Sequence, residues 1–171
     1  MNADDVLDAM QDLILHDGQP PSIQAIARTL GRSKQAVLHY FPDRDTLEAA
    51  LAARAIARVD EAMNAAAARG DAAATYLRLS LPTTEDRAVA LLVLASLRTR
   101  DSLPSDIDAA IERWEGLLAA ELGSPVRAEV VRLVGDGLFV ESLFGDPPSA
   151  QRIEDLIAHL LGHDVAPGSR P

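Results

Sequence analysis

Lys34, Gln35 and His39 lie in a short segment whose spacing predicts a helix with a polar outer side. Val37 and Phe41 stand four residues apart and fall on the inner side of that helix, which leaves the three polar groups outside. A glutamine amide can pair at two points with an adenine edge, and a lysine ammonium can reach guanine or a phosphate. The chemistry that these residue types offer is therefore recognition of nucleic acid.

Two short helices joined by a glycine turn must position these side chains. The preceding segment carries an apolar stripe at helical spacing, made by Ile23, Ile26, Ala27 and Leu30. Gly31 stands where the chain must turn left-handed after a helix, and Ser33 then offers an N-cap hydroxyl. Pro42 ends the second helix. This is the helix-turn-helix pattern, whose second helix enters a DNA major groove.

These residues resemble the DNA-binding signature of the TetR family of bacterial transcriptional repressors. The likeness covers about the first 47 residues and includes the Ile26-Ala27 pair, a Gly followed by Ser-Lys, and a His-Tyr-Phe-Pro block with Arg44 two residues after the proline. Carried over position by position, the resemblance implies DNA contacts from Ser22, Ser33, Lys34, Gln35, Leu38, His39, Tyr40 and Arg44. Tyr40 and Arg44 would hold the DNA backbone, and the two serines would face phosphates at helix N-termini.

The chain departs from the family pattern at two places. The family usually has a tyrosine where this chain has Leu38, so a phosphate-binding hydroxyl is lost and an exposed leucine is expected to touch a thymine methyl instead. The first helix carries no basic residue, so contacts from an N-terminal arm are not expected.

The distribution of charge also favours residues 22–44 as the DNA-binding segment. The chain has a net charge of −10, yet residues 22–44 hold four basic side chains and one aspartate, a net +3. DNA should therefore meet the protein in this segment, with an affinity that falls steeply as salt rises.

Composition also disfavours other classes of protein. There is no cysteine, so neither disulfides nor thiolate metal sites can form, and no Gly-rich phosphate loop or Ser/His/Asp set indicates an enzyme. No apolar run reaches the roughly 18 residues of a membrane span, and the acidic N-terminus lacks a secretory signal. We expect a cytoplasmic protein with no membrane partner and no cofactor.

Helical periodicity throughout the chain predicts an all-α fold of about nine helices. Residues 1–47 are expected to form a three-helix DNA-binding domain, and residues 48–171 a larger helical domain for ligand binding and dimerisation. The expected helices outside the helix-turn-helix cover residues 3–16, 44–69, 72–80, 85–100 (capped by Thr84), 106–122 (capped by Ser105), 126–144 and 149–161.

The helix expected over residues 126–144 has too many apolar residues for a single stripe. It is either the central core helix or a helix covered on one side by another subunit. The family resemblance implies that the last two helices pair with those of a second copy, through Val130, Val134, Leu138, Ile153, Leu156, Ile157 and Leu160.

The sequence gives weaker indications of an effector pocket and of a metal site. Tyr76, Arg98, Trp114 and Phe139 are candidates to line a pocket for an unidentified small-molecule effector, against the alternative of core packing with a solvated arginine. His159 and His163 lie four residues apart with Asp155 one turn earlier, a spacing that could bind metal but is more often the polar face of a helix, so no metal site is predicted.

The leading hypothesis is a homodimeric, ligand-responsive repressor that binds a palindromic operator in double-stranded DNA. The alternative is a small-molecule or metal-binding helical module whose head has weak or lost specific DNA binding. The acidic N-terminus and the leucine at position 38 favour that alternative.

Overall fold

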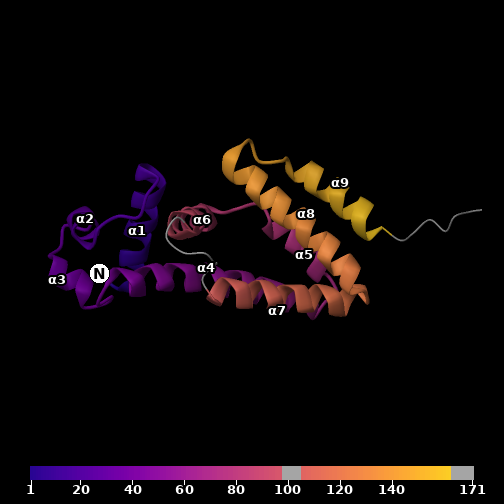
Figure 1. The fold of residues 1–171 in the computed structure, drawn as a ribbon, viewed down its shortest axis with the longest axis horizontal. Helices are drawn as coiled ribbons and strands as arrows, with labels where there is room; N and C mark the ends of the chain where they lie inside the picture. The colour runs from indigo at the N-terminus through magenta and orange to yellow at the C-terminus, as the bar shows by residue number, and fades with distance from the viewer. Residues whose placement is uncertain (98–104, 163–171) are drawn as a thin grey trace, which may run out of the picture. The chain divides into compact units, whose positions relative to one another are not determined.

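The computed structural model describes residues 1–97 and 105–162, and every regular element in these ranges is an α-helix (Figure 1). The helices are α1 (Ala3–Asp17), α2 (Ile23–Thr29), α3 (Lys34–Leu38), α4 (Arg44–Ala67), α5 (Ala72–Leu79), α6 (Thr84–Leu97), α7 (Ser105–Leu122), α8 (Pro125–Phe144) and α9 (Ala150–Leu161). The predicted all-α fold is confirmed, and the nine helices of the described ranges follow the predicted order. None of them is long and apolar enough to cross a bilayer.

Helix ends differ from prediction where local hydrogen bonds decide them. Helix α4 ends at Ala67 instead of residue 69 because Gly70 turns left-handed, with φ of 70°, and its N–H donates to the Ala67 carbonyl over 3.1 Å. The predicted cap of α6, Thr84, is wrong. Thr83 caps this helix: its Oγ1 accepts the Asp86 N–H over 3.2 Å, and the Asp86 carboxylate accepts the Thr83 N–H over 2.8 Å. This reciprocal pair satisfies two backbone donors that the helix itself leaves open.

The chain forms two compact units, each built from two separate stretches of sequence. The first unit contains Met1–Glu61 and Pro82–Trp114, so α6 belongs with α1 to α3 and most of α4. Its fully buried core includes Val6, Met10, Ile14, Ile26, Ala27, Val37, Leu47, Leu51 and Ala88. Helices α2 and α3 lie beside each other, and α6 packs against α1 (Figure 1).

The second unit contains Ala62–Leu81 and the described part of Glu115–Pro171. In this unit α5 packs against both α8 and α9. The Glu121 carboxylate accepts the backbone N–H groups of Ala72 and Ala73, so α7 caps the start of α5. The sequence predicts that the DNA-binding domain ends at Leu47. The division into two compact units does not test where DNA binding ends, so this boundary stays a prediction.

Candidate nucleic-acid interface

The turn between α2 and α3 is built by backbone hydrogen bonds around one glycine. Gly31 has φ of 62°, a conformation that costs residues with a Cβ atom energy but costs glycine little. The Gly31 N–H donates to the Arg28 carbonyl over 3.1 Å, and the Arg32 N–H donates to the Ala27 carbonyl over 2.9 Å. This pair of bonds is the Schellman motif that closes helix C-termini. The predicted left-handed glycine is confirmed.

Serine hydroxyls cap both helices of the pair. Ser22 Oγ accepts the Ala25 N–H over 3.1 Å, and Ser33 Oγ accepts the Ala36 N–H over 3.2 Å. The predicted cap at Ser33 is therefore confirmed. In each bond the hydroxyl acts as acceptor, so its own proton can still donate to an outside oxygen such as a phosphate.

Helix α3 separates its buried and exposed sides as the spacing predicts. Val37 is fully buried, and Lys34, Gln35 and His39 are exposed. Leu38 is half-buried, which corrects the expectation of an exposed leucine. Because part of its surface is already covered, Leu38 offers a smaller apolar contact than the sequence alone indicated.

Tyr40 follows α3 with its ring at the surface and its hydroxyl engaged. The Tyr40 hydroxyl donates to the Met1 carbonyl over 2.7 Å, and the side chain is 37% exposed. The rings of His39 and Tyr40 meet edge to face, with centroids 5.4 Å apart and planes at 81°. To donate to a DNA phosphate, this hydroxyl must first leave Met1.

The start of α4 places an acid and a base next to each other. Asp43 Oδ1 accepts the Thr46 N–H over 2.7 Å, and this bond to the carboxylate lowers the pKa of Asp43. Arg44 Nε donates to the carboxylate of Glu48, one turn along the helix. Glu48 orients the guanidinium and would compete with a phosphate for it.

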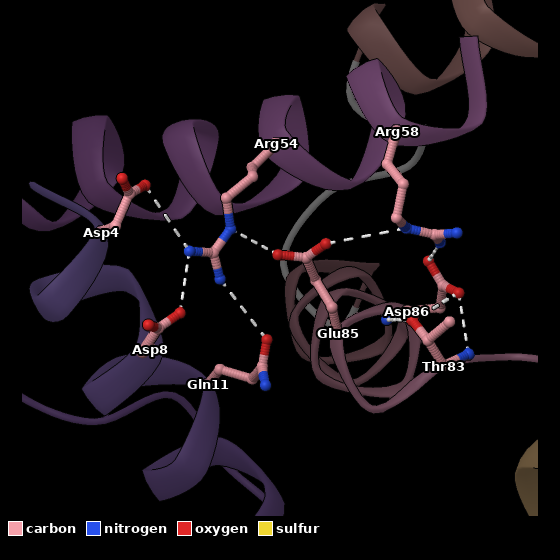
Figure 2. A network of polar contacts seen from close by, with 8 residues as sticks. All are labelled: Asp4, Asp8, Gln11, Arg54, Arg58, Thr83, Glu85 and Asp86. Carbon is pink, nitrogen blue, oxygen red and sulfur yellow. Dashed lines mark hydrogen bonds and ion pairs between the residues drawn. The ribbon is translucent and has the colours of Figure 1, made fainter. Parts of the chain in front are cut away.

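A network of charged side chains joins α4 to α1 and α6 within the first unit (Figure 2). Arg54 Nη1 donates to Asp8 on α1 over 2.9 Å, and Arg54 Nε donates to Glu85 on α6. Arg58, one turn further along α4, donates to Asp86 and also lies 3.9 Å from a Glu85 oxygen. Both arginines thus bind the first turn of α6, where the helix dipole favours carboxylates.

The environment of Arg54 is only partly open to water, since its side chain is 27% exposed. Burial alone would lower the pKa of Arg54, but the hydrogen bonds to Asp8 and Glu85 outweigh it and raise the pKa. Sequence reasoning missed this network, although the two arginines four residues apart on α4 and the acidic pair opening α6 were visible signals.

A surface hollow of about 390 Å³ lies between α1 and the end of α2. It is lined by Met1, Asp5, Asp8, Ala9, Asp12, Thr29, Leu30 and Arg32. Its three aspartates make it unsuitable for phosphate, so the hollow does not extend the basic segment.

The residues suggested for an effector pocket fall in both units. Trp114 lies in the first unit, half-buried, and its Nε1–H donates to Asp60 over 2.7 Å. Tyr76 and Phe139 lie in the second unit, Tyr76 buried and Phe139 half-buried. Arg98 lies outside the described residues.

Tyr76 belongs to a partly buried polar network in the second unit. Its hydroxyl donates to Asp136 over 2.9 Å, and Arg132 donates to the other oxygen of the same carboxylate over 2.7 Å. Burial, and then the charge of Asp136, raise the pKa of Tyr76. This network satisfies the Tyr76 hydroxyl within the second unit.

The residues suggested for dimerisation differ in how far their side chains are exposed to solvent. Val130 is exposed, and Val134, Leu156, Ile157 and Leu160 are half-buried. Leu138 and Ile153 are 7% and 1% exposed and are therefore occupied within the chain. The histidine pair has one described member, His159, which is exposed, while His163 lies outside the described ranges. Among the described residues, no group of His, Asp and Glu side chains is arranged to hold a metal ion.

Comparison with known proteins gives one match. The family model described as tetracycline repressor-like, C-terminal domain, matches residues 70–163, more than half of the chain. Neither the curated proteins nor the solved structures include a match to this chain. The matched region follows the helix-turn-helix and is independent of the residues that carry the resemblance in the first 47. The chain therefore belongs to the TetR family of transcriptional regulators.

Proposed function

We propose that this TetR-family regulator is a ligand-responsive homodimeric repressor that binds a palindromic operator through α2 and α3. The observation that carries the proposal is the division of α3 into a buried anchor, Val37, and three exposed polar side chains, Lys34, Gln35 and His39. A short helix that is held rigidly and presents polar groups outward can read base edges in a major groove.

Each exposed group has a distinct task in this proposal. Gln35 recognises one base by paired hydrogen bonds, and Lys34 contacts guanine or phosphate. Ser22, Ser33, Tyr40 and Arg44 contact the backbone and fix the register of the helix on DNA. The cost of these contacts includes breaking the bonds from Tyr40 to Met1 and from Arg44 to Glu48.

Electrostatics supports binding at this segment and weak binding elsewhere. Arg28, Arg32 and Lys34 are exposed and lie within sixteen residues of Arg44, while the rest of the chain is strongly acidic. Each phosphate contact releases counterions, so the affinity should fall steeply with salt. The acidic remainder repels DNA that is not held by the α2–α3 pair.

Recognition of a palindromic operator requires two copies of the recognition helix. One recognition helix contacts few base pairs, whereas a two-fold pair separated by roughly 34–36 Å reads two half-sites of a palindrome. The exposed apolar face of α8, which includes Val130, Leu133 and Val140, supports pairing between copies.

Response to a ligand requires that the ligand bind the DNA-released state more tightly than the DNA-bound state. The network of Arg54, Arg58, Glu85 and Asp86 supports a route, because it fixes α6 to α4, the helix that begins beside the DNA-contacting residues. Tyr76 and Phe139 remain the candidate effector contacts in the second unit.

The test is selection of bound fragments from random double-stranded DNA with the purified full chain. We expect enrichment of a palindromic motif that is lost in the double variant Lys34→Ala, Gln35→Ala. An unenriched pool at both low and moderate salt would contradict the repressor proposal. That result would favour a ligand-binding module without specific DNA binding.

A further inference from the structure

The Tyr40 hydroxyl is bonded to a residue far earlier in the chain. It donates to the Met1 carbonyl over 2.7 Å, across a separation of 39 residues. The ring is also held edge to face by His39, with centroids 5.4 Å apart. A phenol has a single proton to donate. The proton that the proposed function assigns to a DNA phosphate is therefore already used within the free chain.

We propose that the start of α1 is an autoinhibitory clasp, made of Met1, Asn2 and Asp5, which withholds the Tyr40 hydroxyl from DNA until the clasp opens. The inference rests on the proposed function, in which Tyr40 contacts the DNA backbone. It adds a device that regulates this contact from another helix of the same unit.

The clasp is closed by hydrogen bonds at the cap of α1. The Asn2 N–H donates to Asp5 Oδ2 over 2.7 Å, and the Asp5 N–H donates to Asn2 Oδ1 over 2.8 Å. This capping box fixes the backbone next to Met1. Both bonds are exposed, and exposed bonds at a helix end open with little free energy. The clasp can therefore open while the core of the first unit stays folded.

The rest of α1 is fixed behind the clasp. Val6 is fully buried in the core. Asp8 accepts a hydrogen bond from Arg54 over 2.9 Å, and Arg54 also binds Glu85 on α6 (Figure 2). Asp4, which lies ahead of Val6, reaches Arg54 only at 3.8 Å. Opening is therefore confined to the residues before Val6.

The clasp gives DNA nothing in exchange for the contact that it withholds. Residues 1–17 hold five aspartates and neither lysine nor arginine. The amino group of Met1 lies 3.4 Å from the Asp5 carboxylate and is paired with it. Because the closed segment offers no free cation to a phosphate, closure should weaken DNA binding and not replace one contact by another.

Arg44, the other residue expected to hold the DNA backbone beside Pro42, is engaged in a different way. Its Nε donates to Glu48, one turn along the same helix. An exposed ion pair at this spacing stabilises a helix only slightly, and rotation of one side chain breaks it. Release of Tyr40 instead separates α1 from the end of α3. The clasp, and not Glu48, therefore couples DNA binding to the fold of α1.

Asn2→Ala tests the clasp without changing the charge of the chain. Alanine removes the cap, so the Met1 carbonyl should leave Tyr40 for a larger share of the time. One net hydrogen bond corresponds to roughly fivefold in an equilibrium constant, so we expect DNA binding to tighten by up to about fivefold for each bound copy. In a Tyr40→Phe chain the same substitution should have no effect on binding. Fluorescence anisotropy measures the dissociation constants on a duplex that carries the selected motif.

Two neutral substitutions are matched controls. Asn2→Ser keeps a capping oxygen at the same position and should leave the dissociation constant unchanged. Ser149→Ala removes the cap of α9 in the second unit, where Ser149 Oγ accepts the Arg152 N–H over 3.2 Å, and should also leave it unchanged. Urea unfolding gives a second readout without DNA. Asn2→Ala should lower stability less when residue 40 is phenylalanine than when it is tyrosine.

The outcomes separate failure of the clasp from failure of the proposed function. If the chain selects a motif and Asn2→Ala binds it more weakly, the start of α1 positions Tyr40 for phosphate, so the clasp is wrong and the proposed function stands. Unchanged binding by Asn2→Ala overturns the clasp in the same way. If neither the original chain nor Asn2→Ala selects a motif from random DNA, the proposed function and the clasp both fail. Tighter binding that disappears in the Tyr40→Phe chain supports the clasp.

Discussion

Gly135 of α8 lies so close to Tyr76 of α5 that a Cβ atom on the glycine would be 2.5 Å from ring atom Cε1. The same atom would be 2.7 Å from Ser80 Oγ. These distances are shorter than real contacts, so the approach of the two helices requires glycine at this position. The tyrosine hydroxyl continues past the glycine to Asp136 on the same helix, so one side chain fixes both the spacing of α5 and α8 and the position of a half-buried carboxylate.

Gly135→Ala should therefore destabilise the protein, although alanine favours helix by about 1 kcal/mol. We expect a net loss of about 1–3 kcal/mol in the free energy of unfolding, from the overpacking against Tyr76. Gly116→Ala on α7 is the matched control, since its added Cβ meets nothing within 4 Å and should stabilise the chain. Urea denaturation of both variants measures the difference, and equal stabilisation of the two would contradict the close approach.

Arg54→Ala should destabilise the first unit because it leaves Glu85 partly buried without its closest partner. We expect a loss of about 2 kcal/mol, below the value for a fully buried pair since solvent screens a side chain that is 27% exposed. Arg69→Ala removes an exposed arginine that donates to the Ala65 carbonyl and should change stability by less than about 0.5 kcal/mol. A loss no larger at Arg54 than at Arg69 in thermal or urea unfolding would refute a structural role for the network.

Gln35→Ala and Lys34→Ala should weaken DNA binding in different ways. Gln35→Ala should reduce the free energy of DNA binding by about 1–3 kcal/mol and relax the base preference at one position of each half-site. If Lys34 contacts phosphate, Lys34→Ala should weaken binding to all sequences alike and reduce the salt slope by about 1. Titrations on the selected operator and on single-base variants, at several salt concentrations, separate the two effects.

Leu38→Ala should weaken binding chiefly at positions that contain A·T pairs, where the thymine methyl offers an apolar contact. Because Leu38 is half-buried, the effect should be smaller than that of Gln35→Ala. An equal loss on every sequence would show that Leu38 supports the position of α3 and does not contact a base.

The cap at Asp43 should make stability depend on pH in the acid range. The bond to the Thr46 N–H lowers the pKa of Asp43 in the folded chain. The unfolded chain therefore takes up the proton first as pH falls, so the stabilisation is present above about pH 4 and is lost below it. Asp43→Asn should flatten the stability curve below about pH 5, and an unchanged curve would contradict the cap.

Local signals in the sequence predicted helices and turns well. The spacing of Val37 and Phe41, the glycine at 31 and the serine at 33 each act within one or two turns of chain, and all three agree with the structure. The end predicted for α7 at Leu122 matches the structure, but Ser105, predicted as its cap, is the first residue of the helix. The error at the cap of α6 arose because two adjacent threonines are each followed by polar residues, and only the bonds with Asp86 identify which of them caps.

Packing between distant segments could not be predicted from the same signals. Helix α6 is apolar nearly all round, so its pattern does not reveal that Ala88 joins the core of α1 and α4. Likewise, the excess of apolar residues on α8 left open whether it is the central core helix or a helix covered on one side by another subunit. Burial in the structure assigns Leu138 to the interior and leaves Val130 and Leu133 outside.

The interleaving of the two units has a consequence for how the chain matures on the ribosome. The core around Leu51 is incomplete until Ala88 has left the exit tunnel, and by then α5 is already made but still lacks α8 and α9. The helix-turn-helix is therefore synthesised before the last residues of its own core. The first unit is complete once Trp114 has been made, whereas α5 stays without its partners until residues 125–161 follow, so the two cores close in order along the chain.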